Sequence, residues 1–139
     1  MGKCEGAKVG EGTSKKFTFA KRFEELEVWQ EARRLAVEIY VAFSECKDFG
    51  FRNQIQDASV SVMNNIAEGF ERRSKAEFCR FLDIAKGSSG ETRSMLYLAH
   101  DIGHIKANQA MELIQEYEIL SKRIASLMNM LHNMNTGRQ

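Results

Sequence analysis

Four successive segments of this chain repeat apolar residues at steps of three and four, the spacing of one buried face of an α-helix. The sequence contains no proline, so no residue inside these segments lacks a backbone donor. The predicted helices span Glu24 to about Cys46, about Arg52 to Glu68, Ser74 to about Ile102, and about Asn108 to Leu131. Joined by short loops, they predict an all-α fold, an antiparallel up-down-up-down four-helix bundle.

Helix boundaries are indicated by a capping motif and by glycines. Ser74 and Glu77 form an S-x-x-E capping box, which predicts the start of the third helix. Gly50 is interpreted as a left-handed cap after the first helix, Gly69 as the end of the second, and Gly103 as the end of the third.

Two further glycines, Gly87 and Gly90, fall inside the third predicted helix. Each is about 1 kcal/mol less favourable than alanine in a helix interior. We therefore expect a neighbouring helix to approach the third helix closely at this point.

The first two predicted helices each carry a second apolar stripe beside the first. A helix in an isolated bundle needs only one apolar face, so the extra width favours burial against another copy of the chain, in a cyclic homo-oligomer. The alternative is that the second stripes flank a wide core within one copy. The predicted self-association stripe comprises Val28, Leu35, Val60, Met63, Ala67 and Phe70.

Charge and composition divide the chain into a body and two tails. Residues 1–22 hold six basic and two acidic side chains, a net charge of +4, so the remainder carries −3 of the overall +1. This glycine- and lysine-rich segment cannot bury enough apolar area to offset its ordering entropy. We predict a flexible basic tail over residues 1–22, the bundle over 23–133, and a C-terminal tail over 134–139.

The cysteines and the hydropathy indicate the compartment. Cys4, Cys46 and Cys79 are odd in number and far apart, which fits neither a disulfide framework nor a zinc site. No run approaches the roughly 18 apolar residues of a membrane span. The sequence thus predicts a cytoplasmic protein without a membrane partner.

Several motifs carry a resemblance to a known family. The first helix reads LEVWQEARRLAVEIY, and it is followed by N-I-A-E-G at the end of the second helix and by F-L-x-I-A-x-G-S-x-x-E in the third. This combination resembles the bacterial four-helix-bundle family first noticed in intervening sequences of 23S rRNA genes, and it covers about Phe23 to Leu131. The resemblance implies an antiparallel bundle, often a homopentamer, mostly without an assigned activity.

Some relatives are accessory subunits of diversity-generating retroelements, in which a basic surface engages RNA and the reverse transcriptase. Family members often carry paired arginines where this chain has Gln56 and Asp57, and a proline where it has Met63. Because phosphate neutralisation supplies most non-specific affinity for nucleic acid, the lost charges weaken that role here. The retroelement function is therefore not carried over to this chain.

The histidines offer little support for a metalloenzyme. Di-iron bundles use Glu-x-x-His pairs, and no histidine here has a glutamate three residues before it. Asp101 and His100 precede His104 by three and four residues, a spacing that can hold two metal ligands. Helix capping near Gly103 is the favoured interpretation, since histidines interact well with a helix C-terminus. We predict no metal, no cofactor and no catalytic residue.

Four polar residues fall where adjacent helices could bring them together inside the bundle: Asn65, Glu68, Ser88 and Glu91. One interpretation is an acid/base pair of Glu68 and Glu91, with pKa values separated by burial. The favoured interpretation is a hydrogen-bond network that fixes helix register, because no nucleophile or phosphate-binding loop accompanies these residues.

Basic residues are expected to gather at the end of the bundle where the first helix starts and the second meets the third. These possible phosphate-contacting residues are Lys15, Lys16, Lys21, Arg22, Arg72, Arg73 and Lys75. The sequence thus favours a non-catalytic, homo-oligomeric scaffold or adaptor. The alternative is a nucleoprotein accessory subunit that binds RNA or DNA non-specifically through this end. Its partner would then be RNA or an enzyme that acts on nucleic acid.

Overall fold

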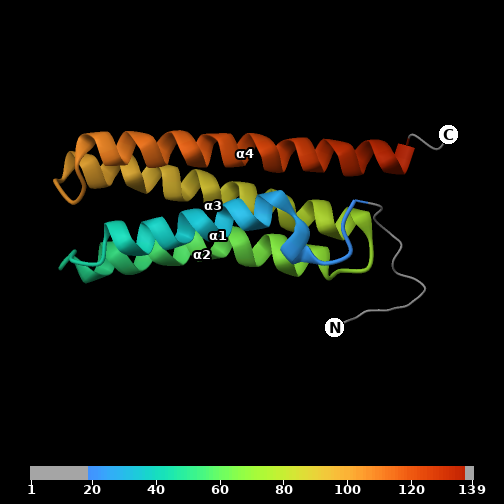
Figure 1. Cartoon of the computed structure of the whole chain (residues 1–139), viewed down its shortest axis with the longest axis horizontal. Coiled ribbons are helices and arrows are strands. Elements are labelled where there is room, and N and C mark those ends of the chain that lie inside the picture. The colour runs from blue at the N-terminus through green and yellow to red at the C-terminus, as the bar shows by residue number, and fades with distance from the viewer. Residues whose placement is uncertain (1–18, 137–139) are drawn as a thin grey trace.

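The computed structural model describes residues 19–136 and contains four α-helices after one short 3₁₀ turn. The turn η2 spans Phe23–Glu25, and the helices are α1 (Glu27–Ala42), α2 (Phe49–Phe70), α3 (Lys75–Asp101) and α4 (Ala107–Thr136). They lie lengthwise side by side, and the chain reverses direction at each loop (Figure 1). The predicted all-α architecture of four helices is confirmed, with no strand between residues 19 and 136.

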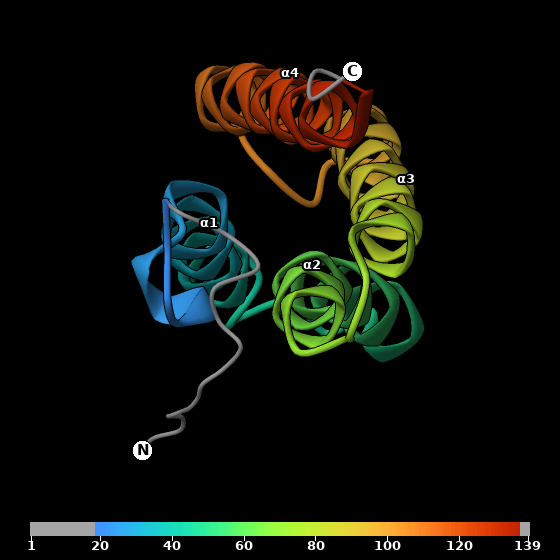
Figure 2. The ribbon, with the colours of Figure 1, turned by 90° about the vertical axis from the view of Figure 1, so that its right-hand side faces the viewer.

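Viewed from the end, α1 and α3 lie on opposite sides of the molecule, with α2 and α4 between them (Figure 2). The most extensive packing joins α3 to α4 and α2 to α3, and α1 packs more on α2 than on α4. No close backbone contact joins α1 and α3 within the described chain. Each of these two helices therefore has an outer face directed away from the other.

Every helix contributes large apolar side chains to one continuous core. Burial of each such side chain stabilises the fold by about 1.5–3 kcal/mol relative to exposure. The largest fully buried side chains are Leu35, Ile39, Phe43, Ile55, Ile66, Phe78, Leu82, Leu96, Tyr117, Leu120, Ile124 and Leu131.

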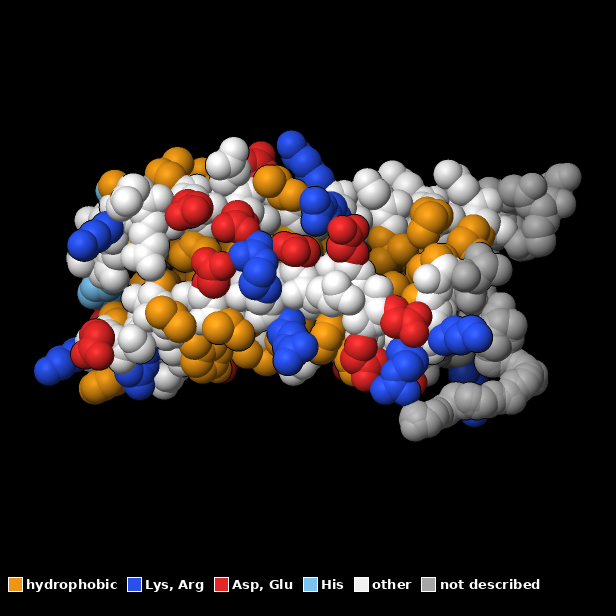
Figure 3. All heavy atoms as spheres, viewed as in Figure 1, with side chains coloured by type: hydrophobic (Ala, Val, Ile, Leu, Met, Phe, Trp, Pro, Cys, Tyr) orange, Lys and Arg blue, Asp and Glu red, His pale blue; other side chains and the backbone are white. Residues whose placement is uncertain are grey.

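Charged side chains connect α1 to α4 along one side of the bundle. Arg34 of α1 donates to Glu31 at 2.8 Å and to Glu38 at 2.7 Å on its own helix, and also to Glu116 of α4. Acidic and basic side chains gather over α1 and α4 on the face in Figure 3. An exposed pair contributes little alone, so the network is the stabilising unit here.

Polar caps account for the starts of two helices. Ser74 accepts a hydrogen bond from the Glu77 backbone N–H at 3.1 Å, which confirms the predicted start of α3. The Glu77 carboxylate lies 3.9 Å from Arg72 Nε. Asp48 caps α2 by accepting from the Phe51 N–H at 3.2 Å. Gly103, with φ of 81°, follows the end of α3 as expected.

Two glycine predictions are wrong. Gly50 is not a left-handed cap but lies in the first turn of α2, because Asp48 starts that helix earlier than expected. Among the described glycines, the positive φ is found at Gly103 instead. Gly69 does not end α2, which continues to Phe70. A Cβ at Gly69 would lie 2.6 Å from Phe81 Cβ, so this glycine lets α2 and α3 approach each other.

The close approach expected at Gly87 and Gly90 is not made by the described part of the same chain. A Cβ built at either position would meet nothing within 4 Å. Both glycines remain helical within α3. Packing inside one copy therefore gives no reason for either glycine.

The predicted division into body and tails needs one change. Helix α4 runs to Thr136, three residues beyond the boundary predicted at 133, because its helical pattern continues through Met134. The predicted tail over residues 1–22 falls mostly outside the described residues. No described helix combines the length and apolar character needed to cross a membrane.

Candidate interaction surface

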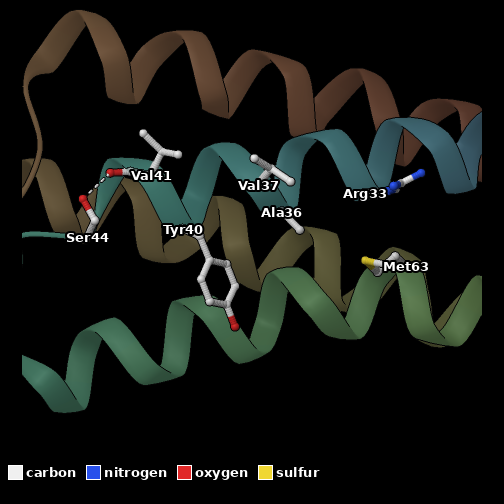
Figure 4. Close-up of a pocket in the computed structure, with 7 residues that line it drawn as sticks. All are labelled: Arg33, Ala36, Val37, Tyr40, Val41, Ser44 and Met63. Atoms are coloured by element: carbon white, nitrogen blue, oxygen red, sulfur yellow. Dashed lines mark hydrogen bonds between the residues drawn. The ribbon is translucent and has the colours of Figure 1, made fainter.

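Helix α1 exposes three large apolar side chains to solvent within five residues. Val37, Tyr40 and Val41 have exposed fractions of 57%, 45% and 67%. They border a groove of about 490 Å³ between α1 and α2 (Figure 4), lined by Arg33, Ala36, Val37, Tyr40, Val41, Ser44 and Met63. We refer to these seven residues as the α1/α2 groove. Hydrophobic side chains gather over these helices in Figure 3.

The local sequence explains why α1 has apolar side chains on both faces. Residues 35–43 read LAVEIYVAF, in which Glu38 is the one charged residue. Leu35, Ile39 and Phe43 enter the core, so the intervening Val37 and Val41 must point outward. The sequence interpretation missed these exposed residues. The available signal was a helix that is apolar almost all round, which is typical of burial on more than one side.

The predicted self-association stripe is only partly exposed. Val28, Leu35 and Phe70 are 5%, 1% and 5% exposed, so their assignment to an open surface is wrong. These residues belong to the core cluster, which is wide enough to take the second stripes of α1 and α2. Val60, Met63 and Ala67 are half-buried on α2, and Met63 lines the α1/α2 groove.

The predicted polar network forms with a different membership. Ser61 Oγ lies 2.8 Å from Ser88 Oγ, and Asn65 Nδ2 donates to the Ser61 carbonyl at 2.8 Å and to its hydroxyl at 3.0 Å. Glu68 and Glu91 are exposed and lie outside this network, so their inclusion is wrong. Glu68 instead pairs with Arg72 at 2.8 Å. The two carboxylates therefore lack the burial on which the acid/base interpretation depends.

A second buried hydroxyl pair joins α3 to α4. Ser89, fully buried, donates to the Tyr117 carbonyl at 3.1 Å and lies 2.8 Å from Ser121 Oγ. Thr92 bonds back to the Ser88 carbonyl on its own helix at 2.9 Å. The sequence interpretation missed these contacts, since small hydroxyl residues give no periodic signal. They satisfy buried polar groups and fix the helix register.

The histidines have local structural partners. His104 Nε2 lies 3.0 Å from Asp48 Oδ2, and its ring contacts Phe51 edge-on at 5.4 Å between centroids. This hydrogen bond, reinforced by the cap at Phe51 N–H, holds the pKa of Asp48 below its usual range. His100 Nδ1 lies 3.6 Å from Asp101 Oδ1. Between residues 19 and 136, no three His, Cys, Asp or Glu side chains are grouped to hold a metal ion.

The predicted basic end contains acidic partners as well. Figure 1 shows the start of α1 and the loop between α2 and α3 at the same end of the molecule. There Arg22 pairs with Glu24 at 2.8 Å, while Arg72 pairs with Glu68 and stacks 4.8 Å from the Phe81 ring centroid. Lys21, Arg73 and Lys75 complete the described part of the group, and Lys15 and Lys16 lie outside the described residues.

Comparison with known proteins identifies similarity over most of the bundle. The sequence pattern of the 23S rRNA-intervening sequence protein family matches residues 24–126. A crystal structure of a protein of unknown function from the S23 ribosomal protein family of Bacteroides thetaiotaomicron is 26% identical and superposes with a TM-score of 0.69. The match covers 73% of this chain and 97% of that chain. No curated protein matches significantly.

Proposed function

Because this chain belongs to the 23S rRNA-intervening sequence protein family, we propose that it is a non-catalytic scaffold or adaptor that functions as a cyclic homo-oligomer of up-down-up-down bundles. One observation carries the proposal: the α1/α2 groove exposes Val37, Tyr40 and Val41 beside Met63. Contiguous apolar side chains of this size, bordered by polar residues, are typical of protein interfaces.

The energetics of burial support a second copy as the occupant. Covering one large aliphatic side chain stabilises an assembly by about 1.5–3 kcal/mol before the losses of association are subtracted. Several adjacent side chains are therefore needed, and α1 supplies them from a single rigid helix. In a closed ring every copy makes the same contacts, so no copy is left with this apolar surface exposed.

Two polar residues singled out in the sequence have structural partners, which supports the non-catalytic part of the proposal. Ser88 is engaged with Ser61, and His104 with Asp48. Each hydrogen bond joins two elements of the fold: α2 with α3 in the first case, and the start of α2 with the loop before α4 in the second. These contacts favour a structural role for both residues.

A charge placed in the groove tests the proposal. Val41→Lys should reduce the mass measured by light scattering to that of one chain, because the lysine cannot be buried without a partner. Its fold should be retained, since Val41 is 67% exposed and lies near the C-terminus of α1, where a cation is favourable. Circular dichroism checks the helix content.

Ile119→Lys is the matched control. Ile119 is 45% exposed on α4 and does not line the α1/α2 groove, so its replacement should leave the mass of the assembly unchanged. An unaltered multimer in Val41→Lys would contradict the proposed role of the groove. Equal dissociation of both variants would show a general effect of added charge.

The alternative function is nucleic-acid binding at the basic end. It is favoured because the start of α1 and the loop between α2 and α3 lie at the same end (Figure 1), and these segments carry Lys21, Arg22, Arg72, Arg73 and Lys75. Any such binding should be non-specific and should weaken steeply with salt, because it rests on phosphate neutralisation. Arg73→Glu should then weaken retention of a fluorescent RNA at low salt, whereas Val41→Lys should retain the RNA as wild type does, because it leaves the basic end unchanged. Binding that is tight and independent of salt would contradict this alternative.

A further inference from the structure

The described residues leave three large apolar side chains uncovered on the outer face of α3. Ile84, Leu98 and Ile102 have exposed fractions of 43%, 48% and 47%. With Gly87 and Glu91, both exposed, they lie along one side of the helix at successive steps of three, four, seven and four residues. We refer to these five residues as the α3 ridge. Since α3 lies opposite α1 in Figure 2, the ridge and the α1/α2 groove belong to different sides of the molecule.

Gly87 gives the ridge a low point at which another helix could come close. Its Cβ position is open, with no atom within 4 Å, and Gly90 one turn further is equally open. Gly69 shows by contrast how a glycine in this fold is used when a helix of the same chain approaches, because its Cβ position is blocked by Phe81. A close approach at Gly87 would have to come from outside the described part of the chain.

The groove and the ridge lie at the same level along the bundle. The hydrogen bond between Ser61 and Ser88 sets the register of α2 against α3. Met63, two residues beyond Ser61, lies beside Ala36 and Arg33 in the groove (Figure 4). Because α1 and α3 run in the same direction (Figure 1), a rotation about an axis parallel to the helices brings Val37 of one copy opposite Gly87 of the next.

The same register brings complementary polar groups together. Arg33 is exposed at the groove, with its guanidinium 5.4 Å from the Trp29 ring centroid. Its level corresponds to that of Asp83, an exposed acidic residue next to Ile84. About two turns further along each helix, Tyr40 on α1 and Glu91 on α3 are also exposed, and a tyrosine hydroxyl can donate a hydrogen bond to a carboxylate. Opposite charges at matched levels favour this pairing and its orientation.

We propose that the α3 ridge of one copy occupies the α1/α2 groove of the next copy, with Gly87 packed against Val37. The inference rests on the proposed self-association and specifies its contact. The two surfaces differ, so the interface is heterologous, and each copy uses both surfaces once. Such an interface forms the proposed ring when the rotation between neighbouring copies divides a full turn.

The contact is tested by a substitution at Gly87 that raises helix propensity but places a side chain where the neighbouring helix would pack. Gly87→Gln should keep or raise the thermal midpoint of the helical signal of one chain, because glutamine is the better helix former and its Cβ meets nothing. It should reduce the light-scattering mass to that of one chain. The matched control is Gly50→Gln, an exposed helical glycine on α2, which should leave the multimer intact.

Disulfide trapping tests the same contact without relying on dissociation. Val37→Cys and Gly87→Cys chains, mixed and oxidised, should form a covalent dimer containing one chain of each kind. Two controls should give no covalent dimer. The first is wild type, which has only its native cysteines, and the second is a mixture of Val37→Cys with Ile119→Cys. A wild-type multimer that persists in Gly87→Gln and gives no trapped dimer would overturn this inference while leaving the proposed scaffold intact. A monomeric wild type would overturn both.

Discussion

Gly69 determines how closely α2 and α3 pack near the turn that joins them. A Cβ there would lie 2.6 Å from Phe81 Cβ and 3.3 Å from the Phe78 carbonyl oxygen, and neither neighbour can move without shifting α3. Overpacking of this kind costs about 1–3 kcal/mol, more than the helix propensity that alanine gains. Gly69→Ala should therefore lower the free energy of unfolding by about 1–2 kcal/mol, as measured by urea denaturation.

Gly50→Ala is the matched control, because its Cβ would meet only Asp48 Oδ1 at 4.0 Å. This variant should be as stable as wild type or more stable by up to about 1 kcal/mol. If Gly69→Ala were equally stable, the close packing of α2 on α3 would be contradicted. The contact between Gly69 and Phe81 also explains why the sequence wrongly predicted that Gly69 ends α2. A glycine near a helix end serves equally as a cap or as a contact point, and only the position of Phe81 distinguishes them.

The contact between Asp48 and His104 links the start of α2 to the loop between α3 and α4. Because the pKa of Asp48 is lowered in the folded protein, its carboxylate stabilises the fold above its unfolded pKa of about 3.9, and this contribution is lost as the pH falls through the lower folded value. Asp48→Asn retains a helix cap but cannot titrate. Wild type should exceed this variant in urea midpoint at about pH 6 and lose that advantage at about pH 3. An advantage that did not change with pH would contradict this link.

The helices themselves could largely be predicted from the sequence, since periodic apolar residues and the Ser74 cap are local signals. The sides on which they pack could not. Val28, Leu35 and Phe70 look like a second surface in the pattern but enter a wide core, whereas Val37 and Val41 remain outside it. Periodicity gives the width of an apolar face, but its boundary with solvent depends on how neighbouring helices are rotated. For the same reason Ser61 could not be chosen over Glu91 as the partner of Ser88.

The molecule as a whole combines a family fold with two unlike surfaces on opposite sides. All four helices contribute to one core cluster within a single chain. Large apolar side chains are left exposed on α1, α3 and α4, and those on α1 and α3 support assembly through repeated contacts between one side and the other. Near-neutral net charge, +1 over the chain, leaves little long-range repulsion to oppose such contacts.

The absolute mass of wild-type protein in solution, measured by light scattering at low and high salt with the ratio of absorbance at 260 and 280 nm (standard wavelengths for nucleic acid and protein), tests this account most directly. We predict a multimer whose mass does not change with salt and whose absorbance is that of protein alone, because apolar contacts are little screened by ions. A monomer at both salt concentrations would contradict self-association. A multimer that carries nucleic acid at low salt and loses it at high salt would instead favour the nucleoprotein role.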